Sequence, residues 1–313
     1  MDQDFKRSKS NREIVSAISG RQRLLKLSNI MVVIAFLGIA FCPAGILGWE
    51  RSPLIGLAFL ALTAVCVFLC VFLGKNIRKQ EAKIKELVGQ YIVKGILAEK
   101  IDIVEYSPTR YINNKFVRNC SILPGYDKIS GSDYISGNYR GRKFIYCDLL
   151  LESENKGTSN TTQFQGHLIK MELGKDINGF VRIKERKNPR KSNGFLAGLF
   201  GTGSSYNSIE TENAAFNDQF EVKASDDHLA FYILTPQFME SVMRLDKLAD
   251  GYTKIEFRGT SVVLALNNGR DSFEVNKILR SRRRLEKYRQ RFREELEIIL
   301  GVFDEVLTKE NLF

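Results

Sequence analysis

The sequence predicts an α+β protein: an N-terminal two-helix transmembrane hairpin, then a cytoplasmic mostly antiparallel α+β domain and a long C-terminal amphipathic helix. Three observations predict this architecture: two uncharged runs near the N-terminus, a central series of short segments rich in Ile, Val, Phe and Tyr, and a final stretch with apolar residues at helical spacing. The expected parts are a basic cytoplasmic N-terminus (1–26), the hairpin (27–74), a juxtamembrane amphipathic helix (75–100), the α+β domain (101–276) and the C-terminal helix (277–313).

The two uncharged runs, residues 27–49 and 53–74, are long enough to predict membrane spans. At a rise of about 1.5 Å per residue each run reaches roughly 33 Å, which exceeds the ~30 Å hydrocarbon core of a bilayer. Only residues 50–52 separate the runs, so the chain must turn back between them. Buried core helices and a cleaved signal peptide are the alternatives, but the first run is long for a signal peptide and lacks a small-residue cleavage site.

Basic residues flank both runs, and the turn between them has no net charge. This bias predicts a multi-pass protein of the cell membrane with two spans and both termini in the cytoplasm. The residues expected at the membrane interface are Arg21, Arg23 and Lys26 before the first run, Trp49 at its end, and Lys75, Arg78 and Lys79 after the second.

The net charge of +11 is concentrated outside the central region. Residues 1–26 and 75–100 each carry seven Lys or Arg and three acids, whereas residues 277–293 carry nine Lys or Arg and one acid. Residues 294–313 carry six acids and one Lys. The charge excess therefore indicates which partners the flanks attract, and says little about the nearly neutral domain at 101–276.

The central region predicts strands with one or two inserted helices, which is typical of an α+β domain. Short apolar and aromatic segments bounded by Gly, Asn and Pro lie at residues 101–108, 143–153, 162–173, 179–186 and 219–225. Residues 254–266 predict two strands joined by a two-residue turn at Gly259 and Thr260. Residues 235–248 predict a helix, because Thr235 suits the cap and Pro236 suits the first turn.

The C-terminal stretch predicts a long helix with one continuous apolar stripe from Leu285 to Val306, a pattern shared with coiled coils. Its basic residues are the candidates for a charged contact: Arg282, Arg283, Arg284, Arg289 and Arg293. They form either a solvated face that pairs with acids elsewhere, a contact with anionic lipid or a partner protein, or a nucleic-acid contact. Tyr288 and Phe292 lie on the apolar stripe, which argues against their stacking on bases.

The glycine-rich stretch from Gly194 to Ser205 is a second candidate contact. It lacks the Gly-Lys-Ser/Thr of a Walker loop and the glycine order of a dinucleotide-binding turn, so no cofactor is predicted. Phe195, Leu199 and Phe200 stand close to several Lys and Arg, a composition typical of a lipid or partner contact. The alternative is a flexible loop whose glycines allow the turns.

No catalytic or metal site is predicted. The two histidines, His167 and His228, lie far apart in sequence, and a zinc site needs three or four converging ligands. The five cysteines form no paired pattern, which is typical of a reducing compartment. Cys147 lies in an apolar strand, where core packing is expected rather than a reactive thiolate.

Four segments resemble a known family: residues 132–153, 162–173, 225–247 and 261–275. The chain is similar in plan to an uncharacterised bacterial membrane family catalogued as domain of unknown function 3137. The resemblance covers roughly residues 80–276 and is best in the Leu-Thr-Pro-x-Phe-Met-Glu stretch at Leu234–Glu240. It departs after Gly166, where the family usually has a second Phe and this chain has His167 and Leu168. The family implies an architecture and no active site.

These observations favour a membrane-anchored cytoplasmic interaction or scaffold protein, and nothing in the sequence argues for an enzyme. The alternative is a membrane-tethered binder of nucleic acid or anionic lipid that uses the basic C-terminal helix. The expected partners are the lipid bilayer and another membrane or cytoplasmic protein, or a second copy of the chain. No small-molecule substrate is inferred.

Overall fold

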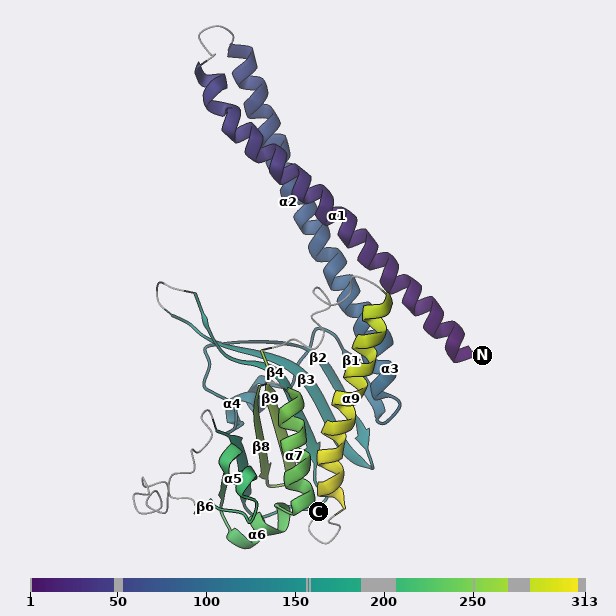
Figure 1. Ribbon diagram of the computed structural model, residues 1–313, viewed down its shortest axis with the longest axis vertical. Coiled ribbons are helices and arrows are strands. Elements are labelled where there is room, and N and C mark those ends of the chain that lie inside the picture. The colour runs from purple at the N-terminus through teal and green to yellow at the C-terminus, as the bar shows by residue number, and fades with distance from the viewer. Residues whose placement is uncertain are drawn as a thin grey trace. The chain divides into compact units, whose positions relative to one another are not determined.

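A computed structural model describes residues 2–47, 53–155, 157, 159–186, 207–249, 251–269 and 282–308 (Figure 1). The chain divides into two compact units. The first contains Met1–Tyr91 with Val275–Glu286, and the second contains Ile92–Glu274 with Lys287–Phe313.

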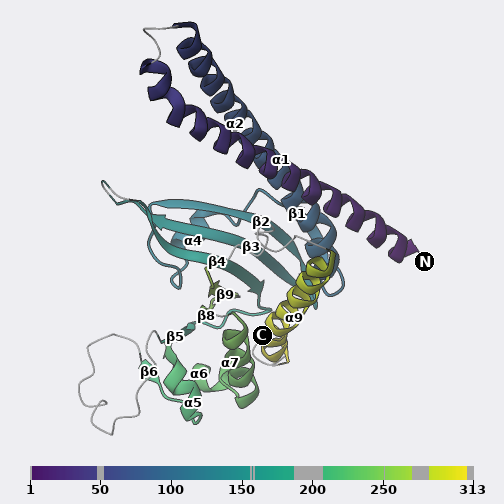
Figure 2. The same cartoon turned by 45° about the horizontal axis from the view of Figure 1, so that its top comes forward.

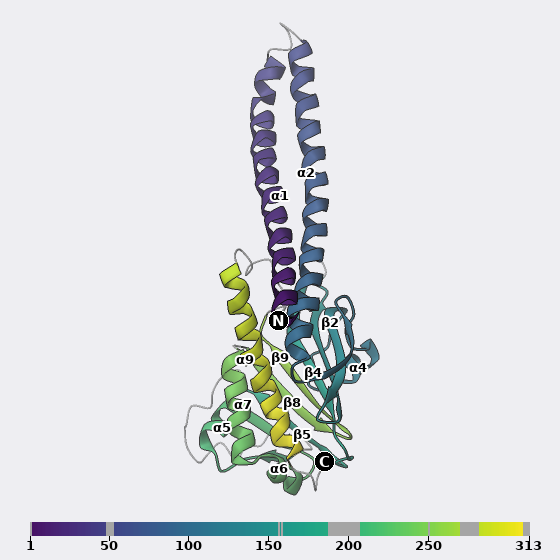
Figure 3. The same ribbon diagram turned by 90° about the vertical axis from the view of Figure 1, so that its right-hand side faces the viewer.

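The first unit is built on two long helices, α1 (Asp2–Leu47) and α2 (Pro53–Val88), which run side by side in opposite directions (Figure 3). Pro53 occupies the first position of α2, where its missing N–H group costs no helical hydrogen bond. Arg21 of α1 and Glu81 of α2 form an ion pair with an Nη2–Oε1 distance of 2.6 Å. The pair links the two helices in their charged halves.

Within the part of the chain that the structure describes, no helix is both long enough and apolar enough to cross a membrane. The predictions of a transmembrane hairpin at 27–74 and of a two-span, multi-pass cell-membrane protein with both termini cytoplasmic are therefore wrong. They treated each uncharged run as a helix of its own. In the structure the first run continues from the charged residues 2–26 within α1, and the second continues into the charged residues 75–88 within α2.

The second unit contains a fully antiparallel sheet, which confirms the α+β prediction for this region. Its strands follow the order β1-β2-β3-β4-β9-β8-β5-β7-β6. The strands are β1 (Asp102–Ser107), β2 (Lys128–Tyr139), β3 (Arg142–Ser153), β4 (Thr161–Glu172), β5 (Phe180–Glu185), β6 (Asn207–Ile209), β7 (Phe220–Ala224), β8 (Tyr252–Arg258) and β9 (Ser261–Asn267).

Helices cover both faces of this sheet (Figure 3). On one face, Phe238 of α7 (Pro236–Ala249) packs edge-on against Phe257 of β8, with 5.8 Å between ring centroids. On the other face, α4 (Asn114–Asn119) covers an apolar cluster that includes Cys147, Leu168 and Ala265. The sheet therefore has a buried core on each side. The remaining helical pieces are α3 (Lys94–Leu97), which follows a π-helical turn (Gly89–Val93), α5 (Ala214–Gln219) and α6 (Asp227–Ile233).

The C-terminal helix α9 (Arg282–Leu307) buries most of the predicted apolar stripe. Phe303 meets Phe144 of β3 edge-on, with centroids 6.1 Å apart. Asp304 accepts a hydrogen bond from the Tyr139 hydroxyl at 2.7 Å and pairs with Arg140 at 3.0 Å. Burial and the Asp304 carboxylate raise the pKa of Tyr139 to about 12. Acids near the C-terminal end of a helix oppose its dipole, and these contacts offset that cost for Asp304.

Candidate interaction site

The helices α5, α6 and α7 gather at one end of the sheet (Figure 2). Residues of these helices and of the segment before α5 line an open pocket of about 840 Å³. Its volume falls within the range of ordinary ligand pockets, about 300–1,000 Å³. Two chain segments form it, one on each side. The lining residues are Thr211, Glu212, Asn213, Ala214, Ala215, Phe231, Leu234, Thr235, Pro236 and Met239.

The first wall, residues 211–215, is fixed by a side chain that follows it. Asn217 accepts hydrogen bonds from the Thr211 amide (3.0 Å) and hydroxyl (2.8 Å), and its own amide donates to the Thr211 carbonyl (2.7 Å). Asn213 caps α5 by accepting from the Phe216 amide at 3.1 Å. Phe216 is fully buried beneath this wall and stacks on Phe220 at 4.8 Å. The wall is thus held in one conformation before any partner binds.

The second wall is the tight junction between α6 and α7. Asp226 caps α6 by accepting a hydrogen bond from the His228 amide at 3.0 Å. The Leu234 amide closes the helix onto the Ala230 carbonyl at 2.8 Å, and the chain then enters α7 at Pro236. Leu234 and Met239 are buried, whereas Phe231 is 53% exposed. The pocket therefore has an apolar base and an exposed aromatic ring at its edge.

Acidic residues dominate the elements around the pocket. Residues 207–219 and 225–240 contain no Lys or Arg and six acids: Glu210, Glu212, Asp218, Asp226, Asp227 and Glu240. Of the ten lining residues, Glu212 alone carries a charge. The pocket thus combines an apolar lining with a negative surround.

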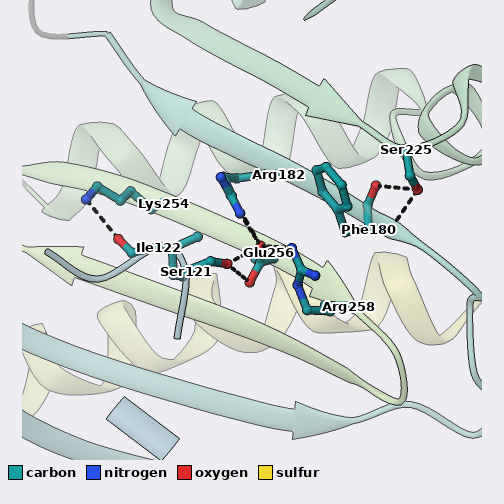
Figure 4. A network of polar contacts seen from close by, with 8 residues as sticks. All are labelled: Ser121, Ile122, Phe180, Arg182, Ser225, Lys254, Glu256 and Arg258. Carbon is teal, nitrogen blue, oxygen red and sulfur yellow. Dashed lines mark hydrogen bonds and ion pairs between the residues drawn. The ribbon is translucent and has the colours of Figure 1, made fainter. Parts of the chain in front are cut away.

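A buried polar network on the α4 face of the sheet is a second cluster of charged groups (Figure 4). Glu256 of β8 is 4% exposed and accepts from Arg182 at 2.9 Å, from Arg258 at 3.3 Å and from the Ser121 hydroxyl at 2.5 Å. Both guanidinium groups also lie over the Phe180 ring, 5.6 and 4.8 Å from its centroid. The network joins β5, β8 and the segment after α4, and we assign it a structural role because each charge in it has a partner.

His167 belongs to a buried cluster across β3, β4 and β9. Its Nδ1 atom lies 2.6 Å from Asp148 Oδ1, and its Nε2 atom lies 3.0 Å from the Asn268 side-chain nitrogen. An amide nitrogen only donates, so Nε2 accepts and Nδ1 carries the hydrogen that Asp148 accepts. Both ring nitrogens are engaged, and Tyr146 stacks on the ring at 5.7 Å. This arrangement holds three strands together and leaves no ring nitrogen for a substrate.

The described thiols of this unit are protonated at neutral pH. Burial raises the pKa of Cys120 to about 11 and the pKa of Cys147 to about 12. Cys147 is fully buried, which confirms the prediction that it packs in the core. Within the described residues, no three His, Cys, Asp or Glu side chains gather so as to hold a metal ion.

The structure places the predicted contact residues as follows. Trp49, Phe195, Leu199 and Phe200 lie outside the described residues, and so do the side chains of Arg282, Arg283 and Arg284, whose backbone begins α9. Arg23, Lys26, Lys75, Arg78 and Lys79 are exposed on α1 and α2, whereas Arg21 pairs with Glu81. Their role at a lipid interface rested on the predicted spans and stays an untested prediction.

The basic helix is engaged within the protein where its side chains are described. Arg289 is 6% exposed, and Arg293 pairs with Glu99 through an Nη2–Oε1 distance of 2.7 Å. Arg291 pairs with Glu295 one turn further along α9. These contacts fit the expectation that the helix charges pair with acids, and they leave Arg289 and Arg293 poorly placed to neutralise phosphates.

Sequence reasoning missed the pocket, because its two walls come from segments about twenty residues apart. One feature of the sequence lies beside the pocket. The stretch that best carries the family resemblance, Leu234–Glu240, supplies Leu234, Thr235, Pro236 and Met239 to the second wall.

Comparison with known proteins gives three findings. A search of curated proteins gives no match. Among solved structures, the mycobacterial trehalose monomycolate transport factor A, TtfA, aligns with 10% identity and a TM-score of 0.32, over 67% of this chain and 95% of that one.

A family model described as "Protein of unknown function (DUF3137)" matches residues 162–307. The match begins later than the resemblance seen in the sequence and extends through the end of α9, which that resemblance did not reach. It includes both walls of the pocket. This match confirms the resemblance to the DUF3137 family of proteins of unknown function over residues 162–307.

Proposed function

We propose that this chain is a non-catalytic interaction protein that binds a partner protein at the pocket between α5, α6 and α7. The observation that carries the proposal is a preformed pocket with an apolar base and an exposed aromatic edge. Exposed apolar surface beside a cavity is typical of a protein-binding site.

The chemistry of the pocket supports binding rather than catalysis. Its lining offers Glu212 as a charged group but no histidine, cysteine or lysine beside it to act as a base or nucleophile. Leu234, the residue that follows α6, and Met239 of α7 are buried at the base, so binding requires little rearrangement. The second unit then serves as a scaffold that presents this surface on a rigid sheet.

A comparison of pocket-filling variants tests the proposal. Ala215 is exposed in the first wall, so Ala215→Trp adds bulk to the pocket without entering the core. Ala98, exposed at the end of α3, provides the matched control Ala98→Trp. We expect a partner isolated with the intact protein from its native cells to be lost with Ala215→Trp and retained with Ala98→Trp. Retention by both variants would contradict the proposal.

A further inference from the structure

We infer that the occupant of this pocket is a basic segment of a partner protein that inserts one large apolar side chain. The inference rests on the proposed function and adds the chemistry of the partner. Two independent features carry it: the apolar lining and the sign of the surrounding charge.

The lining selects a large apolar side chain. Ala214, Ala215 and Pro236 present small or rigid apolar surfaces, and Met239 adapts to the shape of what it contacts. Phe231 is 53% exposed at the edge, where a second ring can stack against it. Covering this ring and the base removes apolar surface from water, which favours Phe, Leu or Trp over a polar side chain.

The charge selects a basic segment. Six acids and no Lys or Arg occupy the residues on either side of β7 that build the pocket, at 207–219 and 225–240. Among the described residues, three bases lie on neighbouring elements and are engaged. Lys223 pairs with Glu221 at 3.6 Å, Arg244 pairs with Glu240 (one of the six acids) at 3.1 Å, and Arg186 donates to the Asn217 and Phe220 carbonyls. Lys or Arg beside the inserted side chain would therefore meet complementary potential, whereas an acidic segment would be repelled.

The same sign argues against a phosphate-rich partner. Nucleic acids and anionic lipid surfaces attract positive surfaces and lose affinity where acids face them. A protein segment with interspersed Lys and Phe or Leu matches both the apolar lining of the pocket and the acidic residues around it.

Labelled peptides and the intact protein test the inference by fluorescence polarisation. The probe has a central Phe flanked by Lys on both sides, and two comparators replace the Phe by Ala or the Lys residues by Glu. We expect the probe to bind about tenfold or more tightly than either comparator, which corresponds to about 1.4 kcal/mol. Added salt should weaken its binding, because the charges involved are near solvent.

Matched variants locate the effect. The double variant Glu210→Gln and Glu212→Gln should weaken the binding of the probe several-fold, and Ala215→Trp should abolish it. The double variant Glu294→Gln and Glu297→Gln, on the exposed side of α9, should bind normally.

The outcomes separate this inference from the proposed function. If the acidic peptide binds as well as the basic probe, the charge argument is wrong while the pocket remains an interaction site. If no peptide binds although Ala215→Trp releases a native partner, the partner chemistry is wrong and the proposed function stands. If Ala215→Trp releases nothing, the proposed function itself fails and this inference with it.

Discussion

The carboxyl groups of Glu185 of β5 and Asp246 of α7 lie close enough to interact electrostatically. Burial, followed by this contact with Asp246, raises the pKa of Glu185 to about 7. Asp246 is 6% exposed and also accepts from the Gln219 amide, and the Thr253 amide donates to Glu185 at 3.0 Å. This interaction joins the sheet to α7, the helix whose first turn forms part of the second wall of the pocket.

This carboxyl pair predicts a pH dependence of stability. The ordinary pKa of Glu185 is 4.5 and the folded value is about 7, so the folded protein holds the extra proton between these values. Stability should therefore fall as pH rises from about 4.5 through about 7. Glu185→Gln keeps a hydrogen bond without titrating, and should exceed the parent by about 1 kcal/mol at high pH, a value discounted because Glu185 is partly exposed.

Urea unfolding across this pH range provides the measurement. Glu221→Gln, at a partly exposed carboxylate that pairs with Lys223, is the control and should follow the parent. Parallel pH profiles for the parent and Glu185→Gln would show that folding does not raise the pKa of Glu185.

Adding one methyl group at Gly166 of β4 should strongly lower the stability of the protein. A Cβ atom at this position would lie 1.9 Å from the Leu266 carbonyl oxygen of β9, so one of two paired strands must move. Gly166→Ala should destabilise the protein by about 3 kcal/mol or more, measured by thermal unfolding. Gly95→Ala is the control, because nothing lies within 4 Å of a Cβ there and alanine favours the helix. Equal melting of the two variants would contradict the register of β4 with β9.

Glu256 predicts a strong stability effect from its buried network. Glu256→Ala leaves Arg182 and Ser121 without their acceptor in a buried region and should cost about 3–5 kcal/mol. Glu105→Ala breaks the exposed pair with Arg110 and should cost under about 1 kcal/mol. Unfolding in urea measures both. A cost for Glu256→Ala no larger than that for Glu105→Ala would mean that the carboxylate is solvated.

The hydrogen bonds of Asn217 should control the local stability of the first wall of the pocket. Asn217→Ala removes three hydrogen bonds to Thr211 and should destabilise the protein by about 2 kcal/mol. The first wall should then open more often, seen as faster amide hydrogen exchange at residues 211–215. Gln290→Ala removes one exposed hydrogen bond to Glu294 on α9 and should leave this exchange unchanged. Unaltered exchange in Asn217→Ala would show that the wall is held by other contacts.

The strands that the sequence predicted are those with dense Ile, Val and Phe. They include β3, β4, β5, β7 and the β8–β9 hairpin, whose turn lies at Gly259 and Thr260 as expected. β2 was missed because Ser and Gly interrupt its apolar pattern. Its Gly131 and Gly137 allow close approach, since a Cβ at either would lie 2.5 Å from a neighbouring carbonyl oxygen. Both glycines are visible in the sequence, but they indicate a close approach of neighbouring strands only once the strand pairing is known.

The candidate site could not be predicted in the same way. A pocket depends on which side chains stay small or exposed after two distant segments meet, and Ala214, Ala215 and Phe231 have no distinctive sequence pattern. The Glu185–Asp246 contact likewise joins residues about sixty positions apart. The transmembrane prediction failed for a related reason, because it judged each uncharged run without the charged half of its helix.

Photo-cross-linking at Phe231 in native cells tests the central claim, binding of a partner protein at the pocket, most directly. A benzophenone amino acid at this position, 53% exposed at the pocket edge, should cross-link to one partner protein. Ala215→Trp in the same chain should abolish that cross-link. The same amino acid at Val104, 75% exposed on β1, should give no such product. A cross-link at Phe231 that persists in the filled pocket, or its absence in the parent protein, would contradict the account.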